Sequence, residues 1–218
     1  ARRRQAFLRA VLRAVRDRIG TDVTLAVKLN SSNFVRGGIS THEALGAVRA
    51  AEEEGVDLIE ISGGTFESAA MIGRPTRAVD GGGVDSEAYF AEFLHAAVRV
   101  TTVPLMLTGG LRSAAGMSQA SQGGASLIGL GRPMVLGPHL PRALLAGVNI
   151  PIGRPKIRPS RTGLLPAGTE IAWYTEQMRS LAESGNRAPR VLTPAGALAR
   201  LTTRQLAAMA TQRFRAPG

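Results

Sequence analysis

Two glycine-bearing turns carry the residues of this sequence that are best suited to bind an anion. Gly109 and Gly110 follow the apolar run "VPLMLT", and Gly131 and Arg132 follow "SLIGL". Glycine lets the backbone approach a ligand and aim successive N–H groups at an anion, and arginine adds a forked, permanent positive charge. Each charge-assisted hydrogen bond contributes about 1.5 to 3 kcal/mol, so four or five would hold a phosphate dianion. The sequence therefore predicts a phosphate site made of Gly109, Gly110, Gly131 and Arg132, supported by a helix that begins at the second turn.

The elements around these turns alternate between helix and strand. Apolar residues three and four apart predict helices, and short apolar runs predict strands that are covered on both faces. Ser40 and Glu43 form a capping box at the start of the second helix. The predicted strands are 23–29, 56–62, 103–109 and 126–131, and the predicted helices are 4–19, 41–54, 89–98, 113–124 and 170–184. This alternation predicts an α/β fold with a parallel sheet.

The position of the two turns indicates which strands these are. Ligands of parallel βα arrays lie beyond the carboxyl ends of the strands, and eight-stranded barrels frequently bind phosphate in the loops after strands seven and eight. Residues 1–147 are therefore predicted to be the C-terminal half of a (β/α)8 TIM barrel, strands 5 to 8. The absence of an initial Met and of a strand before the first helix agrees with a truncated chain. Residues 148–218 are predicted to form a strap and helices that pack on the barrel, one of them starting near Pro194, with a partly irregular tail.

Composition excludes several classes of function. The sequence has no cysteine, which rules out disulfides, thiolate metal sites and cysteine nucleophiles. The net charge of +11 is almost all arginine, and one Trp with two Tyr offers no series of stacking platforms, so we expect no nucleic-acid partner. No apolar run approaches the roughly 20 residues that cross a bilayer, so we expect no membrane partner and a cytoplasmic protein. We expect no metal, and we expect structural roles for His42, His95 and His139.

A long connection between the second and third units is a second candidate for function. Residues 65–86 are rich in glycine and contain Arg74 and Arg77, and loops of that length in a compact domain are usually functional or disordered. The two arginines are candidates to meet an anionic substrate or NADPH.

Four separated motifs together resemble a known family. They are "VKLNSSNFVRGGIS", "GVDLIEISGGTFESAAM", "PLMLTGGLRSAAGM" and "LIGLGRPMVLGPHLP". In this order they resemble the C-terminal half of the old yellow enzyme family, the FMN-dependent NADH:flavin oxidoreductases and ene-reductases with a single (β/α)8 barrel. The resemblance runs from about Arg3 to Gly147. It implies that Lys28 is a catalytic and FMN-binding residue near the flavin N1 and C2 carbonyl, and that Gly109, Gly110, Gly131 and Arg132 bind the FMN phosphate.

The same resemblance implies the reaction. Hydride would pass from NADH or NADPH to FMN and on to the β carbon of an activated alkene or a similar small-molecule substrate. The substrate-gripping residues of the family lie in the half that is missing here, so we expect this chain alone to be inactive. A homo-oligomer is left open. The alternatives are another FMN-binding or phosphate-binding barrel, such as a dihydroorotate dehydrogenase-like or hydroxyacid oxidase-like enzyme, and a non-catalytic half-barrel module.

Overall fold

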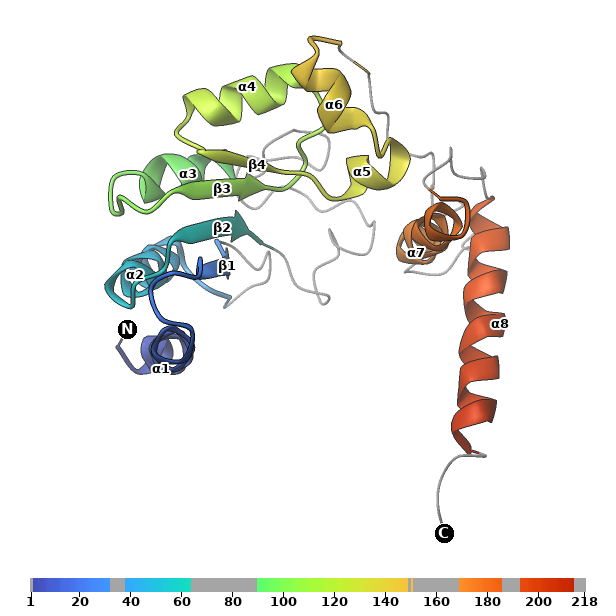
Figure 1. Cartoon of the computed structure of the whole chain (residues 1–218), viewed down its shortest axis with the longest axis horizontal. Helices are drawn as coiled ribbons and strands as arrows, with labels where there is room; N and C mark the ends of the chain where they lie inside the picture. The colour runs from blue at the N-terminus through green and yellow to red at the C-terminus, as the bar shows by residue number, and fades with distance from the viewer. Residues whose placement is uncertain are drawn as a thin grey trace.

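A four-stranded parallel sheet organises the chain. The computed structural model describes residues 2–31, 38–63, 90–148, 150, 169–185 and 193–213. Its strands follow the chain in the order β1-β2-β3-β4, and all neighbours are parallel (Figure 1). They are β1 (Ala26–Asn30), β2 (Leu58–Ser62), β3 (Leu105–Thr108) and β4 (Leu127–Gly129). The predicted α/β fold with a parallel sheet is confirmed.

Helices cover one face of this sheet. They are α1 (Arg2–Ile19), α2 (Thr41–Glu53), α3 (Ala91–Ala97) and α4 (Ala114–Gln122). Ile59, Ile61 and Leu107 alternate along their strands, and their side chains are fully buried against Val48 of α2 and Leu94 of α3. The alternation places every second strand residue in this core, because successive strand side chains point to opposite faces.

The opposite face of the strands is called the open face here. In register across the four strands it carries Lys28, Glu60, Met106 and Leu127. The Lys28 side chain is 55% exposed and Leu127 is 46% exposed. Coverage on both faces, as expected for the strand at 23–29, is therefore not seen among the described residues, and this exposed face is what a half-barrel would leave open.

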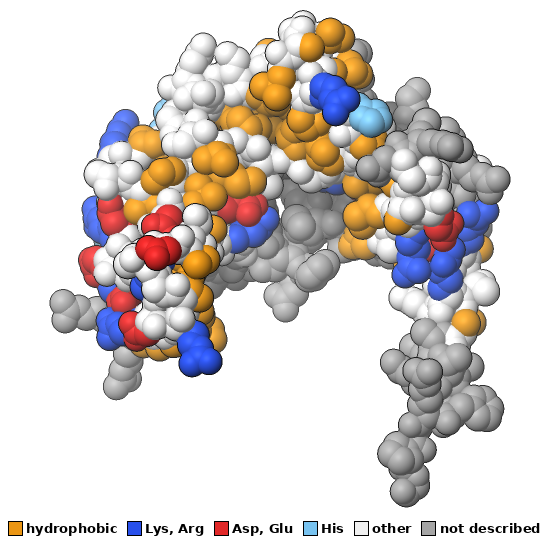
Figure 2. Space-filling view, viewed as in Figure 1, with side chains coloured by type: hydrophobic (Ala, Val, Ile, Leu, Met, Phe, Trp, Pro, Cys, Tyr) orange, Lys and Arg blue, Asp and Glu red, His pale blue; other side chains and the backbone are white. Residues whose placement is uncertain are grey.

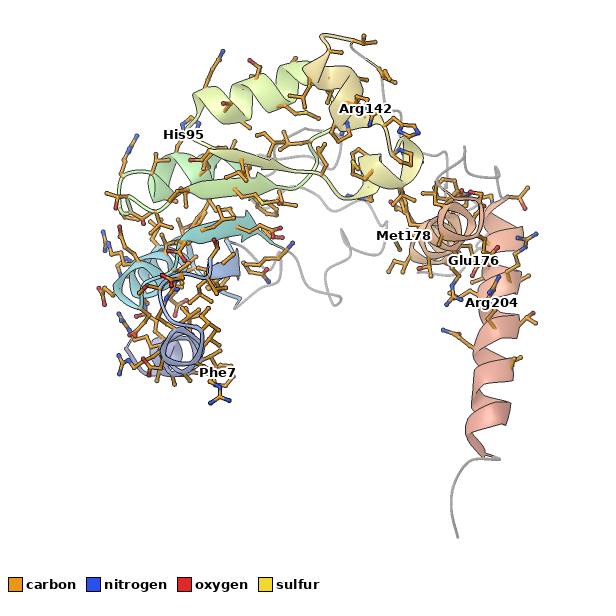
Figure 3. All side chains as sticks on the ribbon, in the orientation of Figure 1. Phe7, His95, Arg142, Glu176, Met178 and Arg204 are labelled. Carbon is orange, nitrogen blue, oxygen red and sulfur yellow. The ribbon has the colours of Figure 1, made fainter. Side chains whose placement is uncertain are left out.

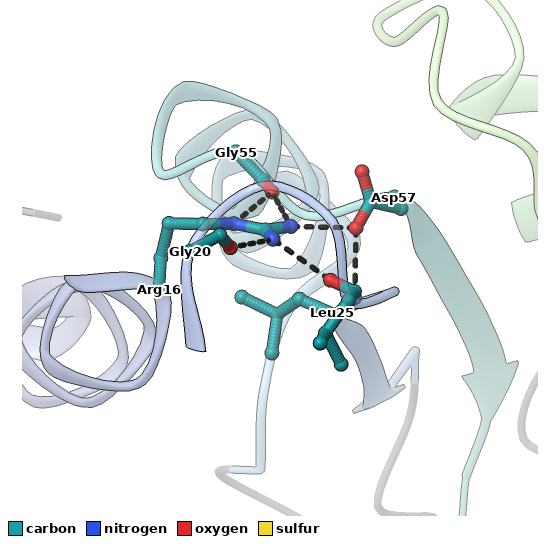
Figure 4. A network of polar contacts seen from close by, with 6 residues as sticks. Arg16, Gly20, Leu25, Gly55 and Asp57 are labelled. Atoms are coloured by element: carbon teal, nitrogen blue, oxygen red, sulfur yellow. Dashed lines mark hydrogen bonds and ion pairs between the residues drawn. The ribbon is translucent and has the colours of Figure 1, made fainter. Parts of the chain in front are cut away.

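Arg16 joins the end of α1 to the first two strands. Its guanidinium donates to the carbonyl oxygens of Gly20, Val23 and Gly55 and to the Asp57 carboxylate, and the Leu25 N–H donates to the same carboxylate at 2.7 Å (Figure 4). The backbone hydrogen bond and the Arg16 charge hold the pKa of Asp57 below its usual value. Because the Val23 carbonyl oxygen accepts from Arg16, it is not free to pair with a neighbouring strand. The strand begins at Ala26 rather than at the predicted residue 23.

Four further helices follow the sheet. They are α5 (Arg132–Leu136), α6 (Leu140–Leu145), α7 (Thr169–Glu183) and α8 (Pro194–Arg213). Trp173 and Tyr174 of α7 are buried with Val135 and Leu136 of α5. The buried Glu176 faces Arg204 of α8 at 3.7 Å (Figure 3). Residues 194–213 form one helix of 20 residues, which begins at Pro194 as predicted, and the rest of the predicted irregular tail lies outside the described residues.

Candidate functional site

The two glycine turns lie side by side at one edge of the sheet. Thr108 and Gly129 are register partners at the ends of β3 and β4. Because the strands are parallel, the chain leaves β3 and β4 at the same carboxyl edge (Figure 1). The turn with Gly109 and Gly110 therefore follows β3 at the edge where the turn with Gly131 follows β4. The predicted phosphate site requires that the two turns be neighbours.

The backbone at these turns differs from one glycine to the next. Gly109 has φ of 132° and Gly110 has φ of 77°, a region that side chains other than glycine rarely adopt. Gly131 has φ of −104°, and a Cβ built there meets no heavy atom within 4 Å. Neither this φ nor the packing of the described residues around it requires glycine at 131. Its lack of a side chain leaves open space beside Arg132, which suits the close approach of a ligand.

Arg132 is the first residue of α5 and is already paired. Its Nη1 donates to Oε1 of Glu170 on α7 at 2.9 Å, and the Arg132 side chain is 50% exposed. Helix α5 has five residues, which is little more than one turn. The predicted contribution of a helix start is therefore weak, and the guanidinium carries the positive charge at this turn.

Two residues beside the first turn were missed by sequence reasoning. Arg112 donates from Nη1 to the carbonyl oxygen of Gly110 at 3.3 Å, which places a second guanidinium at the turn. The Thr108 Oγ1 is buried with no hydrogen-bond partner in the described part of the chain, and it lies 1.9 Å from the position a Cβ on Gly129 would take. The spacing of the "GGLR" segment could have identified Arg112. Nothing in the sequence indicated that Thr108 and Gly129 are partners.

Lys28 lies on the open face, away from the turns. It is in β1, two strands from β3, which corresponds to about 10 Å at the usual strand spacing. Its Nζ lies 2.5 Å from Oε1 of Glu60, its register partner on β2. The Thr108 and Met106 side chains reach over Gly129 on this same face. The structure thus brings the two turns together and places Lys28 two strands away from the first of them.

The remaining candidates are dispersed. His42 lies on α2, His95 on α3 and His139 next to the start of α6, each exposed. Arg74 and Arg77, with the rest of residues 65–86, lie outside the described residues, as does the strap at 151–168. In the described ranges, no cluster of three or more His, Asp or Glu side chains is arranged to hold a metal ion. None of the helices that the structure describes is both long and apolar enough to cross a membrane.

The two turns can bind an anionic group. Glycine turns with guanidinium groups at the carboxyl edge can receive a phosphate. The buried Thr108 Oγ1, which has no hydrogen-bond partner among the described residues, lies at the end of β3, directly before the first turn.

Comparisons with known proteins agree on one family. The family model described as the NADH:flavin oxidoreductase / NADH oxidase family matches residues 1–150. The chain is 33% identical over 193 residues to the NADH-dependent flavin oxidoreductase iccE of Talaromyces variabilis, covering 80% of this chain and 46% of the relative. It is 25% identical over 146 residues to the NADH oxidase of Thermoanaerobacter brockii, covering 66% of this chain and 21% of the relative.

The fold also resembles a solved structure. A 2-naphthoyl-CoA reductase in complex with 2-naphthoyl-CoA matches with a TM-score of 0.55 and 21% identity, covering 66% of this chain and 21% of that one. The likeness concerns the fold alone. The chain spans less than half the length of these relatives.

Proposed function

The chain belongs to the NADH:flavin oxidoreductase / NADH oxidase family, whose enzymes use FMN with NADH as the reductant, and we propose that it forms the FMN-phosphate half of such an enzyme. In this proposal β1 to β4 are strands five to eight of a (β/α)8 barrel, and residues 148–218 pack on it. The order of four parallel strands supports this assignment, as does the placement of the anion-binding turns after the last two.

The surface of α1 and the open face support the barrel assignment. Phe7, Val11 and Val15 are spaced four apart on α1 and are 80%, 42% and 36% exposed. Phe7 projects away from α2 (Figure 3), and hydrophobic side chains gather along this side of the molecule and beneath the last strands (Figure 2). Contiguous exposed apolar surface of this kind usually marks an interaction site. A barrel's first four strands and their helices would cover it.

Each candidate residue has a role in this proposal. The backbones of Gly109, Gly110 and Gly131 and the guanidinium of Arg132 hold the phosphate of FMN. Lys28 lies against the ring and favours the more negatively charged reduced form. FMN, when bound, supplies the transfer of hydride from NADH or NADPH to an activated alkene or similar acceptor. The single observation that carries the proposal is the adjacency of the two turns, with Gly131 open beside Arg132.

Binding of FMN to an Arg132 variant tests this site. Loss of a guanidinium contact to phosphate removes one or two charge-assisted hydrogen bonds of about 1.5 to 3 kcal/mol each, so Arg132→Ala should weaken FMN affinity at least tenfold. The measurement is quenching of flavin fluorescence on titration with protein. The matched control is Arg142→Ala, which removes an exposed arginine from α6 and should leave affinity unchanged. Equal affinities for Arg132→Ala and the unaltered protein would show that the phosphate binds elsewhere.

Experiments on the chain alone distinguish this proposal from the alternative of a non-catalytic half-barrel module. Size-exclusion chromatography with an absorbance scan distinguishes a colourless monomer from a yellow assembly. A yellow dimer indicates that two copies complete a barrel. A colourless monomer that also fails to bind added FMN favours the module.

A further inference from the structure

Lys28 is held by one neighbour on the open face. Lys28 and Glu60 are direct register partners on β1 and β2, and Nζ lies 2.5 Å from Oε1. The next two positions in the same row are Met106 and Leu127, which offer no charge. On this face of the four described strands, Lys28 and Glu60 are the only charged side chains.

The two partners differ in how firmly they are fixed. The Glu60 side chain is 23% exposed, whereas that of Lys28 is 55% exposed. A lysine has a flexible four-carbon stem and loses much rotamer freedom when it is held in one geometry. Glu60 grows from a central strand whose adjacent residues, Ile59 and Ile61, are fully buried. The carboxylate is therefore the anchored member of the pair, and the ammonium is the member that it orients.

We infer that Glu60 is a positioning residue that keeps the Lys28 ammonium on the open face, where it acts on the flavin ring. This inference rests on the proposed function, in which Lys28 meets the ring of FMN. Without an acceptor at position 60, Lys28 spreads over several rotamers toward solvent, and its effect on the ring weakens. The charge of Glu60 is separate from this role, because a neutral glutamine of the same length still offers an oxygen that accepts from Nζ.

The flavin midpoint potential of the FMN-loaded protein measures the role directly. The quantity compared is the change in potential caused by Lys28→Met, determined with Glu, Gln or Ala at position 60. With Glu60 or Glu60→Gln, we expect Lys28→Met to lower the two-electron reduction constant at least tenfold, which corresponds to about 30 mV. With Glu60→Ala, the same change should fall below threefold, because the lysine is no longer held. Ser62→Ala, on the same strand and face, is the control and should leave the Lys28 effect intact.

The outcomes separate this inference from the proposed function. A Lys28→Met effect of equal size with Glu60 and with Glu60→Ala overturns the positioning role, because two charges that act independently are additive. No effect of Lys28→Met with Glu60 present, or no binding of FMN, overturns the proposed function instead. Flavin stoichiometry and the thermal midpoint of each variant verify that it is folded and loaded.

Discussion

A pair of glycine-to-alanine changes on neighbouring strand ends tests both the packing of the open face and the phosphate site. At Gly129 an added Cβ would lie 1.9 Å from Thr108 Oγ1 and 2.7 Å from Met106 Cε. The methionine can move aside, but Thr108 is branched at Cβ and is fixed on β3. At Gly131 the same Cβ meets no heavy atom within 4 Å, and φ is already −104°.

The two variants should differ in stability by a measurable amount. Overpacking of this kind costs about 1 to 3 kcal/mol, so we expect Gly129→Ala to lower the thermal midpoint by roughly 2 to 12 °C for a chain of this length. Gly131→Ala should stay within about 0.5 kcal/mol of the unaltered protein. Thermal unfolding followed by circular dichroism measures both. Thr108→Ala removes the nearest atom and should partly restore the Gly129→Ala variant.

The two variants should also differ in FMN affinity, and here Gly131→Ala is the variant that we expect to be impaired. If the phosphate approaches the backbone at Gly131, a methyl group there displaces it, and FMN affinity should fall at least tenfold in a protein of normal stability. Fluorescence quenching of the flavin gives the affinity. Gly131→Ala protein that is stable and binds FMN normally would refute the reasoning about the second turn. A Gly129→Ala protein as stable as the original would refute the reasoning about the open face.

Three further changes have defined outcomes. Arg16→Lys loses the forked contacts to backbone carbonyls and should destabilise the fold by about 1 to 2 kcal/mol in urea unfolding, whereas Arg18→Lys on the exposed side of α1 should not. The lowered pKa of Asp57 contributes stability above its unfolded value of 3.8, and this stability is lost as pH falls below that value. Asp57→Asn should therefore flatten the acid side of a urea-midpoint profile. Glu170→Gln removes the negative charge beside Arg132, whose side chain is 50% exposed, and should tighten FMN binding by up to about fivefold, measured by the same titration.

Local signals in the sequence predicted the parts of the fold that depend on local chemistry. The capping box is present as predicted, since Ser40 Oγ accepts from the Glu43 N–H and the Glu43 carboxylate accepts from the Ser40 N–H. The existence and order of four strands followed from short apolar runs. The start of β1 did not, because Arg16 fixes the preceding residues through contacts that reach Gly55, 39 residues along the chain.

The residues of the candidate site also divide into those that a local pattern predicts and those that depend on strand pairing. The turns at Gly109, Gly110 and Gly131 were predictable because glycine after an apolar run is a local pattern. The partner of Lys28 was not, since Glu60 is 32 residues away and meets it only through the register of β1 with β2. The spacing of residues within one segment cannot reveal a pairing that depends on which strands are neighbours.

Both cations that we propose to contact FMN are paired with carboxylates from another element. Glu60 on β2 holds Lys28, and Glu170 on α7 holds Arg132. Such partners restrict long side chains to one region, which lowers the entropy lost on binding, but they also offset the positive charge that attracts the ligand. The balance differs between the two sites. A guanidinium has five N–H donors, so Arg132 can contact a phosphate dianion and Glu170 at the same time. In the proposed role Lys28 would face a ring that gains charge only on reduction, and for that role its position matters more than its net charge.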